Sequence, residues 1–117
     1  MAHLDERRLK IWRALSDLFL DTEIDDVTFD YVARTVIETE YTPEEMYMIL
    51  WGEVYPVLES NLRSVTGVWS GWSDEWLLEH IKLSDGKPTA IHGSSIIIGD
   101  IKHCWAAIAS RLPVGYA

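Results

Sequence analysis

The chain has 117 residues, of which 48% are hydrophobic and 25% charged, and its net charge is −9 at pH 7. This length and balance exclude a disordered chain and predict one domain, residues 1–117, with its own core. The acidic charge argues against nucleic acid as a partner. No apolar run approaches the roughly 20 residues of a membrane helix, and the charged N-terminus is no secretory signal. With Cys104 as its single cysteine, the chain is expected to be cytoplasmic.

The negative charge is concentrated in the first half of the chain. Residues 1–60 hold 14 Asp and Glu against 5 Lys and Arg, whereas residues 61–117 hold 5 of each. Between Ala14 and Ser60 the only Lys or Arg is Arg34. A domain that concentrates one sign of charge attracts partners of the opposite sign. A basic protein is therefore the expected partner.

Apolar residues recur at three- and four-residue intervals over residues 5–20 and again over residues 26–38, which predicts two amphipathic helices. The acidic segment between them offers several N-caps for the second helix. The apolar positions of the two patterns are Trp12, Leu15, Leu18 and Phe19, followed by Phe29, Ala33, Val36 and Ile37.

A third helix is predicted over residues 43–59, and its start is the clearest local signal in the chain. Thr42 can act as the N-cap, Pro43 suits the first helical position, and Glu45 completes a capping box. Pro56 either kinks this helix or opens a further helical turn.

Two more helices are predicted over residues 74–83, after an N-cap at Ser73, and over residues 100–112. The apolar stripe of the last helix is Ile101, Cys104, Trp105, Ile108 and Leu112. Residues 89–99 are the least regular, because the β-branched run Ile96–Ile98 is typical of a short strand. The prediction is an all-α, compact bundle of about five helices, with a short β-hairpin near residues 89–99 as the alternative there.

Patterns typical of metal sites and catalysis are incomplete. Asp21, Glu23 and Asp25 have the first spacings of a calcium loop, but its sixth position is Asp26 instead of glycine and its twelfth is Val32 instead of glutamate. Cys104 falls on an apolar stripe, where a buried thiol is the usual explanation. We therefore expect no metal and no cofactor. An enzyme that uses carboxylates or Cys104 as a nucleophile remains an alternative.

Several buried positions can also be predicted. Of the six tryptophans, Trp12 and Trp105 belong to apolar helical stripes and are expected in the core. Trp69 and Trp72 flank a Ser-Gly turn that cannot easily bury both rings, so one of them is expected on a partner surface. Glu53 approaches the apolar side of the third helix and is expected to carry a structural hydrogen bond, with Arg63 as a candidate partner.

Three stretches together resemble an uncharacterised family of small acidic bacterial proteins. They are residues 15–23, residues 62–65 with Gly67 and Trp69, and residues 74–77, and the likeness extends from about Arg8 to Ile81. The resemblance implies a bacterial, non-enzymatic protein. By general type the chain also looks like the immunity proteins that neutralise bacterial toxins, which are short, acidic and poor in cysteine.

These observations predict an acidic binding protein, an immunity protein that inhibits a basic toxin or nuclease domain, with a helical adaptor or regulatory subunit as the alternative. We expect an acidic band along the second helix as the partner-binding surface. The competing interpretation is that the carboxylates before this helix are caps. The candidate partner-binding residues are Asp21, Glu23, Asp25, Asp26, Asp30, Glu38, Trp69 and Trp72.

Overall fold

The computed structural model describes residues 6–19, 24–63, 71–83, 91, 93 and 95–116, and gives the backbone alone for residues 60–63. The residues so described form helices and no strand, which confirms the all-α prediction. In chain order the elements are α1 (Glu6–Ser16), the 3-10 turn η1 (Asp17–Phe19), α2 (Asp26–Thr39), α3 (Pro43–Met48), the π-helical turn η2 (Ile49–Val54), α4 (Tyr55–Arg63), α5 (Asp74–His80) and α6 (Ser95–Ala109).

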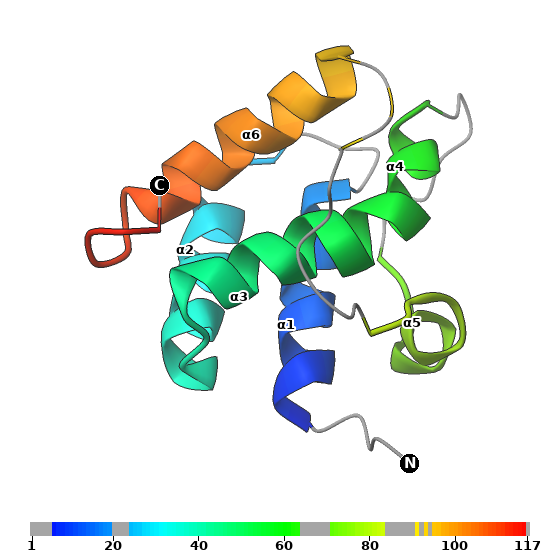
Figure 1. Cartoon of the computed structure of the whole chain (residues 1–117), viewed down its shortest axis with the longest axis horizontal. Coiled ribbons are helices and arrows are strands. Elements are labelled where there is room, and N and C mark those ends of the chain that lie inside the picture. Colours follow the sequence, from blue (N-terminus) through cyan, green and yellow to red (C-terminus); the bar gives the residue numbers. More distant parts are fainter. Residues whose placement is uncertain are drawn as a thin grey trace.

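The helices pack around one core. α1 contacts α2 and α5, and α2 in turn contacts α6. α3, η2 and α4 follow one another as one long helix, which runs below α6 in Figure 1. Within the described ranges, no helix is both long and apolar enough to cross a membrane. The fully buried side chains include Trp12, Leu15, Ile49, Leu58 and Ile101.

Both ends of α2 are fixed by local hydrogen bonds. Asp25 is the N-cap, and its carboxylate accepts from the Thr28 backbone N–H at 3.4 Å. At the other end Glu40 adopts the left-handed conformation, with φ of 60°, and its N–H donates to the carbonyls of Val36 and Ile37. The sequence pattern assigned Ile37 to the apolar side of this helix, but its side chain is 56% exposed, so that assignment is wrong.

The capping box that opens α3 is present as predicted. The Thr42 hydroxyl accepts from the Glu45 N–H at 3.1 Å, and the Glu45 carboxylate accepts from the Thr42 N–H at 2.9 Å. The helix then widens into η2, where the Tyr55 N–H donates to the Leu50 carbonyl five residues earlier. Pro56 follows directly and has no N–H for the carbonyl of Gly52. The wide turn accommodates the proline without ending the helix.

Several boundaries differ from the prediction: α4 continues to Arg63, beyond the expected end at residue 59, and α6 ends at Ala109 instead of residue 112. α5 has the expected N-cap, since the Ser73 hydroxyl accepts from the Trp76 N–H, but it ends at His80 instead of Leu83. α6 begins at Ser95 instead of residue 100, so Ile96–Ile98 are helical and do not form the suggested strand. Helical spacing places Ile97, Ile101 and Ile108 on one buried face. Burial of that face outweighs the strand preference of the isoleucine run.

Candidate functional site

The outward side of α2 carries exposed aliphatic and charged side chains together. Val27 is 74% exposed and Ile37 is 56% exposed, although both are aliphatic. They line a shallow hollow of about 410 Å³ together with Arg34, and Arg111 closes it from the end of α6. Exposed aliphatic side chains bordered by charges are typical of interaction sites. We call this surface the α2 face; it consists of Asp26, Val27, Asp30, Arg34, Ile37 and Glu38.

Cations from other segments hold the carboxylates of the α2 face. Arg111 donates through Nε to Asp30 at 2.5 Å and through a terminal nitrogen to Asp26 at 3.1 Å. Lys10 of α1 pairs with Glu38, and this hydrogen bond lowers the pKa of that carboxyl below its usual value. The charge of the acidic half is therefore partly compensated by Arg111 from outside it and by Lys10 from its own first helix.

Arg111 was not singled out by the sequence, yet it joins α6 to α2. Besides the two carboxylates, its guanidinium donates to the Ala107 carbonyl at 2.6 Å and lies 5.6 Å from the centre of the Phe29 ring. The pairs link residues more than 80 positions apart, so local patterns in the sequence carried no sign of them. The one available signal was a single arginine directly after a long apolar helix.

The structure separates the predicted partner-binding residues into groups. Asp26, Asp30 and Glu38 lie together on the α2 face, whereas Asp25 is the N-cap described above, as the competing interpretation held. Trp72 is half-buried and packs against Trp76, with ring centres 5.9 Å apart. Trp76 in turn stacks on His80 at 4.0 Å. Three predicted residues lie outside the described part of the chain: Asp21, Glu23 and Trp69.

Glu53 is a buried carboxylate inside the core, in agreement with the sequence prediction of a structural hydrogen bond. Its side chain accepts from the Arg8 guanidinium at 2.7 and 2.9 Å and from the Trp12 indole N–H at 2.8 Å. The Arg8 guanidinium also donates to the Tyr41 hydroxyl at 3.2 Å. The predicted partner Arg63 lies outside the described side chains. Arg8 therefore gives the buried charge at least one cation of its own.

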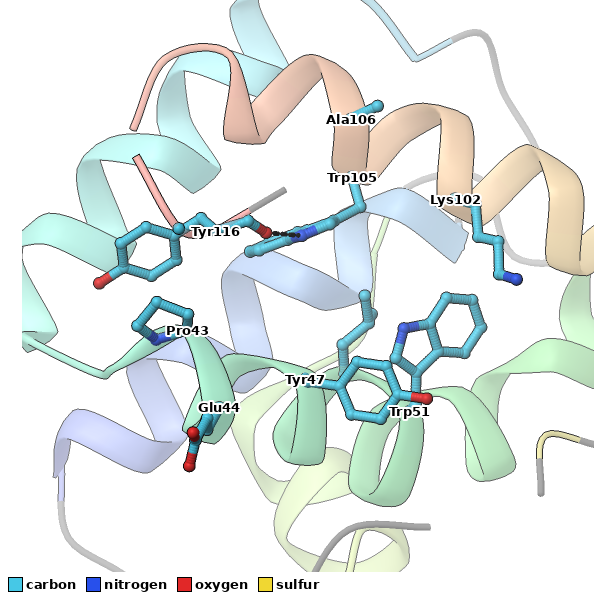
Figure 2. A pocket seen from close by; sticks show the side chains of 10 residues that line it. Pro43, Glu44, Tyr47, Trp51, Lys102, Trp105, Ala106 and Tyr116 are labelled. Carbon is cyan, nitrogen blue, oxygen red and sulfur yellow. Dashed lines mark hydrogen bonds between the residues drawn. The ribbon is translucent and has the colours of Figure 1, made fainter. Parts of the chain in front are cut away.

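A second hollow, the aromatic groove, lies between α6 and the long helix and has a volume of about 470 Å³. Figure 2 shows Tyr47 and Trp51 reaching into it from below and Trp105 from α6 above. Trp105 is half-buried instead of belonging to the core as predicted. The groove is lined by Tyr47, Trp51, Trp105 and Tyr116 and by the charged residues Glu44 and Lys102.

In the comparison with known protein families, residues 6–110 match a domain of unknown function, DUF7079. The chain belongs to the DUF7079 family. No curated protein and no solved structure matches it.

The DUF7079 match covers every helix of the structure, from α1 to α6. It therefore extends well beyond Ile81, where the resemblance noted in the sequence ended. Arg111 and Tyr116 follow the matched region. The residues of the α2 face all lie within it, whereas one wall of the aromatic groove does not.

The described residues of this DUF7079 chain contain no group of three His, Cys, Asp or Glu side chains placed to hold a metal ion. Cys104 is half-buried on α6, and burial, with a smaller effect of the Asp100 charge, raises the pKa of its thiol. A raised pKa keeps the sulfur protonated at neutral pH, which makes it a poor nucleophile.

Proposed function

We propose that this DUF7079 chain is a binding protein that holds a basic partner protein on its α2 face. By class, we propose a cytoplasmic bacterial immunity protein that inhibits a basic toxin domain, such as a nuclease, by direct binding. The single observation that carries the proposal is the combination on α2 of two exposed aliphatic side chains, Val27 and Ile37, with three carboxylates around them.

The two kinds of side chain have different roles in such a complex. Val27 and Ile37 supply apolar area that is removed from water when a partner covers it, and this area slows dissociation. The carboxylates of Asp26, Asp30 and Glu38 bring a basic surface into register and speed association. The net charge of −9 acts at longer range in the same direction.

The ion pairs within the chain are compatible with this role. Arg111 contacts Oδ1 of Asp30 and Oδ1 of Asp26, and in the described part of the chain Oδ2 of neither carboxylate has a hydrogen-bond partner. Arg111 therefore contacts one oxygen of each carboxylate, and the other oxygen of each stays open to a cation. Ordering these side chains before binding reduces the entropy that association costs.

The test needs a defined partner and a change of charge sign on the α2 face. The candidate partner is a toxin domain encoded next to this chain, produced separately and titrated with the purified protein. We expect Ile37→Lys to weaken binding at least about tenfold, because it removes an anchor and adds repulsion. Ile37→Glu should weaken binding less. Ile37 lies in the last turn of α2, where lysine is the better residue for the helix, so a stability effect would give the opposite order.

Val114 supplies the matched control, because it is a fully exposed aliphatic residue that does not belong to α2 or to the hollow on it. Val114→Lys and Val114→Glu should change the affinity less than about twofold. The proposal is wrong if both Ile37 variants behave like the Val114 variants. A partner that binds through the α2 face but has no toxic activity would identify the chain as a helical adaptor instead of an immunity protein.

A further inference from the structure

The aromatic groove has the size and walls of a site for a small molecule. Its volume of about 470 Å³ lies within the range of about 300–1,000 Å³ that is usual for such sites. Two tryptophans and two tyrosines line it, and Tyr47 is 43% exposed although it is a large ring. Flat rings of this kind bind the methylene groups of a ligand by apolar contact.

Hydrogen bonds fix the end wall of the groove. The Trp105 indole N–H donates to the Tyr116 carbonyl at 2.8 Å, and the Tyr116 hydroxyl donates to the Tyr41 carbonyl at 2.5 Å. Gly115 between them has φ of +115°, a conformation that favours glycine, and a Cβ there would lie 3.6 Å from the Pro43 ring. The chain after α6 is thus turned back against α3. Bonds within the chain hold this end wall, so a ligand does not have to order it.

The two charges of the groove lie at its opposite ends. In Figure 2 Glu44 lies at the Pro43 end and Lys102 at the other end, with Tyr47 and Trp51 between them. Both charged side chains are exposed, and neither forms an ion pair within the described residues. By contrast, Arg13 and Arg111 are both paired with aspartates. An unpaired anion and an unpaired cation therefore border one apolar space.

We infer that the aromatic groove binds a small zwitterion with an apolar body, an ω-amino carboxylate, whose ammonium pairs with Glu44 and whose carboxylate pairs with Lys102. A ligand with only a positive charge is repelled by Lys102. A ligand with only a negative charge is repelled by Glu44 and by the net charge of −9 on the chain. A ligand with opposite charges at its two ends satisfies both groups, and its methylene chain covers the rings. This site is independent of any partner on the α2 face.

The probe is 6-aminohexanoate, with hexylammonium and hexanoate as analogues that each lack one charge. Binding is followed by NMR on the full chain, through the indole N–H signals of Trp51 and Trp105, at about 0.15 M salt so that long-range charge effects are screened. We expect 6-aminohexanoate to bind at least about threefold more tightly than either analogue. The gain is modest because exposed ion pairs are weak.

Charge variants test whether Glu44 pairs with the ammonium of the ligand and Lys102 with its carboxylate. Glu44→Gln and Lys102→Gln should each reduce the affinity for 6-aminohexanoate to that of the corresponding singly charged analogue. The exchanged pair Glu44→Lys with Lys102→Glu should restore binding, because the zwitterion can enter in the reverse direction. Glu79→Gln and Lys82→Gln on the α5 side make the same changes in net charge and should have no effect.

Equal affinity for the zwitterion and both analogues would overturn the inference. It would also be overturned if the Glu44 and Lys102 variants bound 6-aminohexanoate as tightly as the α5 control variants. All of the substituted residues are exposed, and the melting temperature of each variant checks that its fold is unchanged. Failure here leaves the proposal for the α2 face untouched, since that proposal is tested with other residues and another ligand.

Discussion

Glu53 holds a negative charge inside the core, with only 1% of its surface exposed. Such a charge is tolerated only when polar groups replace the water that it lost. Arg8 and Trp12 do this from α1, so one carboxylate on η2 fixes the position of α1 against the long helix. The Arg8 guanidinium also donates to the hydroxyl of Tyr41, so the network includes the segment between α2 and α3.

We predict that Glu53→Gln lowers the free energy of unfolding by about 3 kcal/mol, because it leaves the Arg8 cation without its buried counter-charge. Chemical denaturation measures the loss. Asp74→Asn is the matched control, since it also removes the carboxylate partner of one arginine, Arg13, but on the surface. The control should change stability little. Equal losses in the two variants would show that burial adds nothing to the Glu53 pair.

For single residues, the sequence predicted which side chains are buried only where the helical pattern was unambiguous. Trp12 and Glu53 were both placed correctly from their spacing. Ile37 was placed wrongly, because α2 has more apolar residues than its buried face can hold. The spacing alone does not show which of them stays exposed to solvent. Arg111 and its partners depend on contacts across the whole chain, which no local pattern contains.

Among the helices, the long segment formed by α3, η2 and α4 shows how local chemistry determines structure. The capping box fixes where it starts, and the π-helical turn before Pro56 lets it continue. Sequence reasoning identified the box and the proline, but it left open whether the helix would kink or continue. The outcome depends on the core, since five of the six residues of η2 are buried.

We predict that Thr42→Ala lowers the free energy of unfolding by about 1 kcal/mol, because it removes the acceptor for the Glu45 N–H. Thr42→Ser keeps a hydroxyl at the same place and should be nearly neutral. Thermal or denaturant unfolding of the two variants provides the comparison. If alanine and serine are equally stable, the capping box is not what holds the start of α3.

α6 illustrates the limit of local preference. Three consecutive isoleucines favour a strand in isolation, and the sequence analysis placed the helix start only at residue 100. The helix forms because Ile97 and Ile101 continue the buried face of Ile108. Which side of such a run is covered is decided by α2 and α4, the elements that contact it, and these are far away in the sequence.

For the molecule as a whole, the sequence overstated the separation of charge. Its first half is strongly acidic, but the fold brings Arg111 from the second half onto α2 and pairs Lys10 with Glu38. The net charge of −9 remains, and it attracts basic partners from a distance. At short range, the carboxylates of the α2 face form ion pairs within the chain.

We predict that the association rate with a basic partner falls steeply as ionic strength rises through about 0.15 M, where the screening length is about 8 Å. The dissociation rate should change much less, because the apolar contacts of Val27 and Ile37 are not screened. Stopped-flow or surface-binding kinetics at a series of salt concentrations measure both rates. An association rate that does not respond to salt would remove electrostatic attraction from the proposed function.

The fold-back of the chain after α6 also sets the order in which the molecule can be assembled. Tyr116 binds the carbonyl of Tyr41, 75 residues earlier, and Arg111 reaches Asp26, 85 residues earlier. A ribosome makes these anchors last among the described residues, so a nascent chain can form α1 and α2 long before the groove has its end wall. Such distant contacts close slowly. Of the described surfaces, the α2 face and the aromatic groove thus receive their last contacts only when the chain beyond α6 has been made.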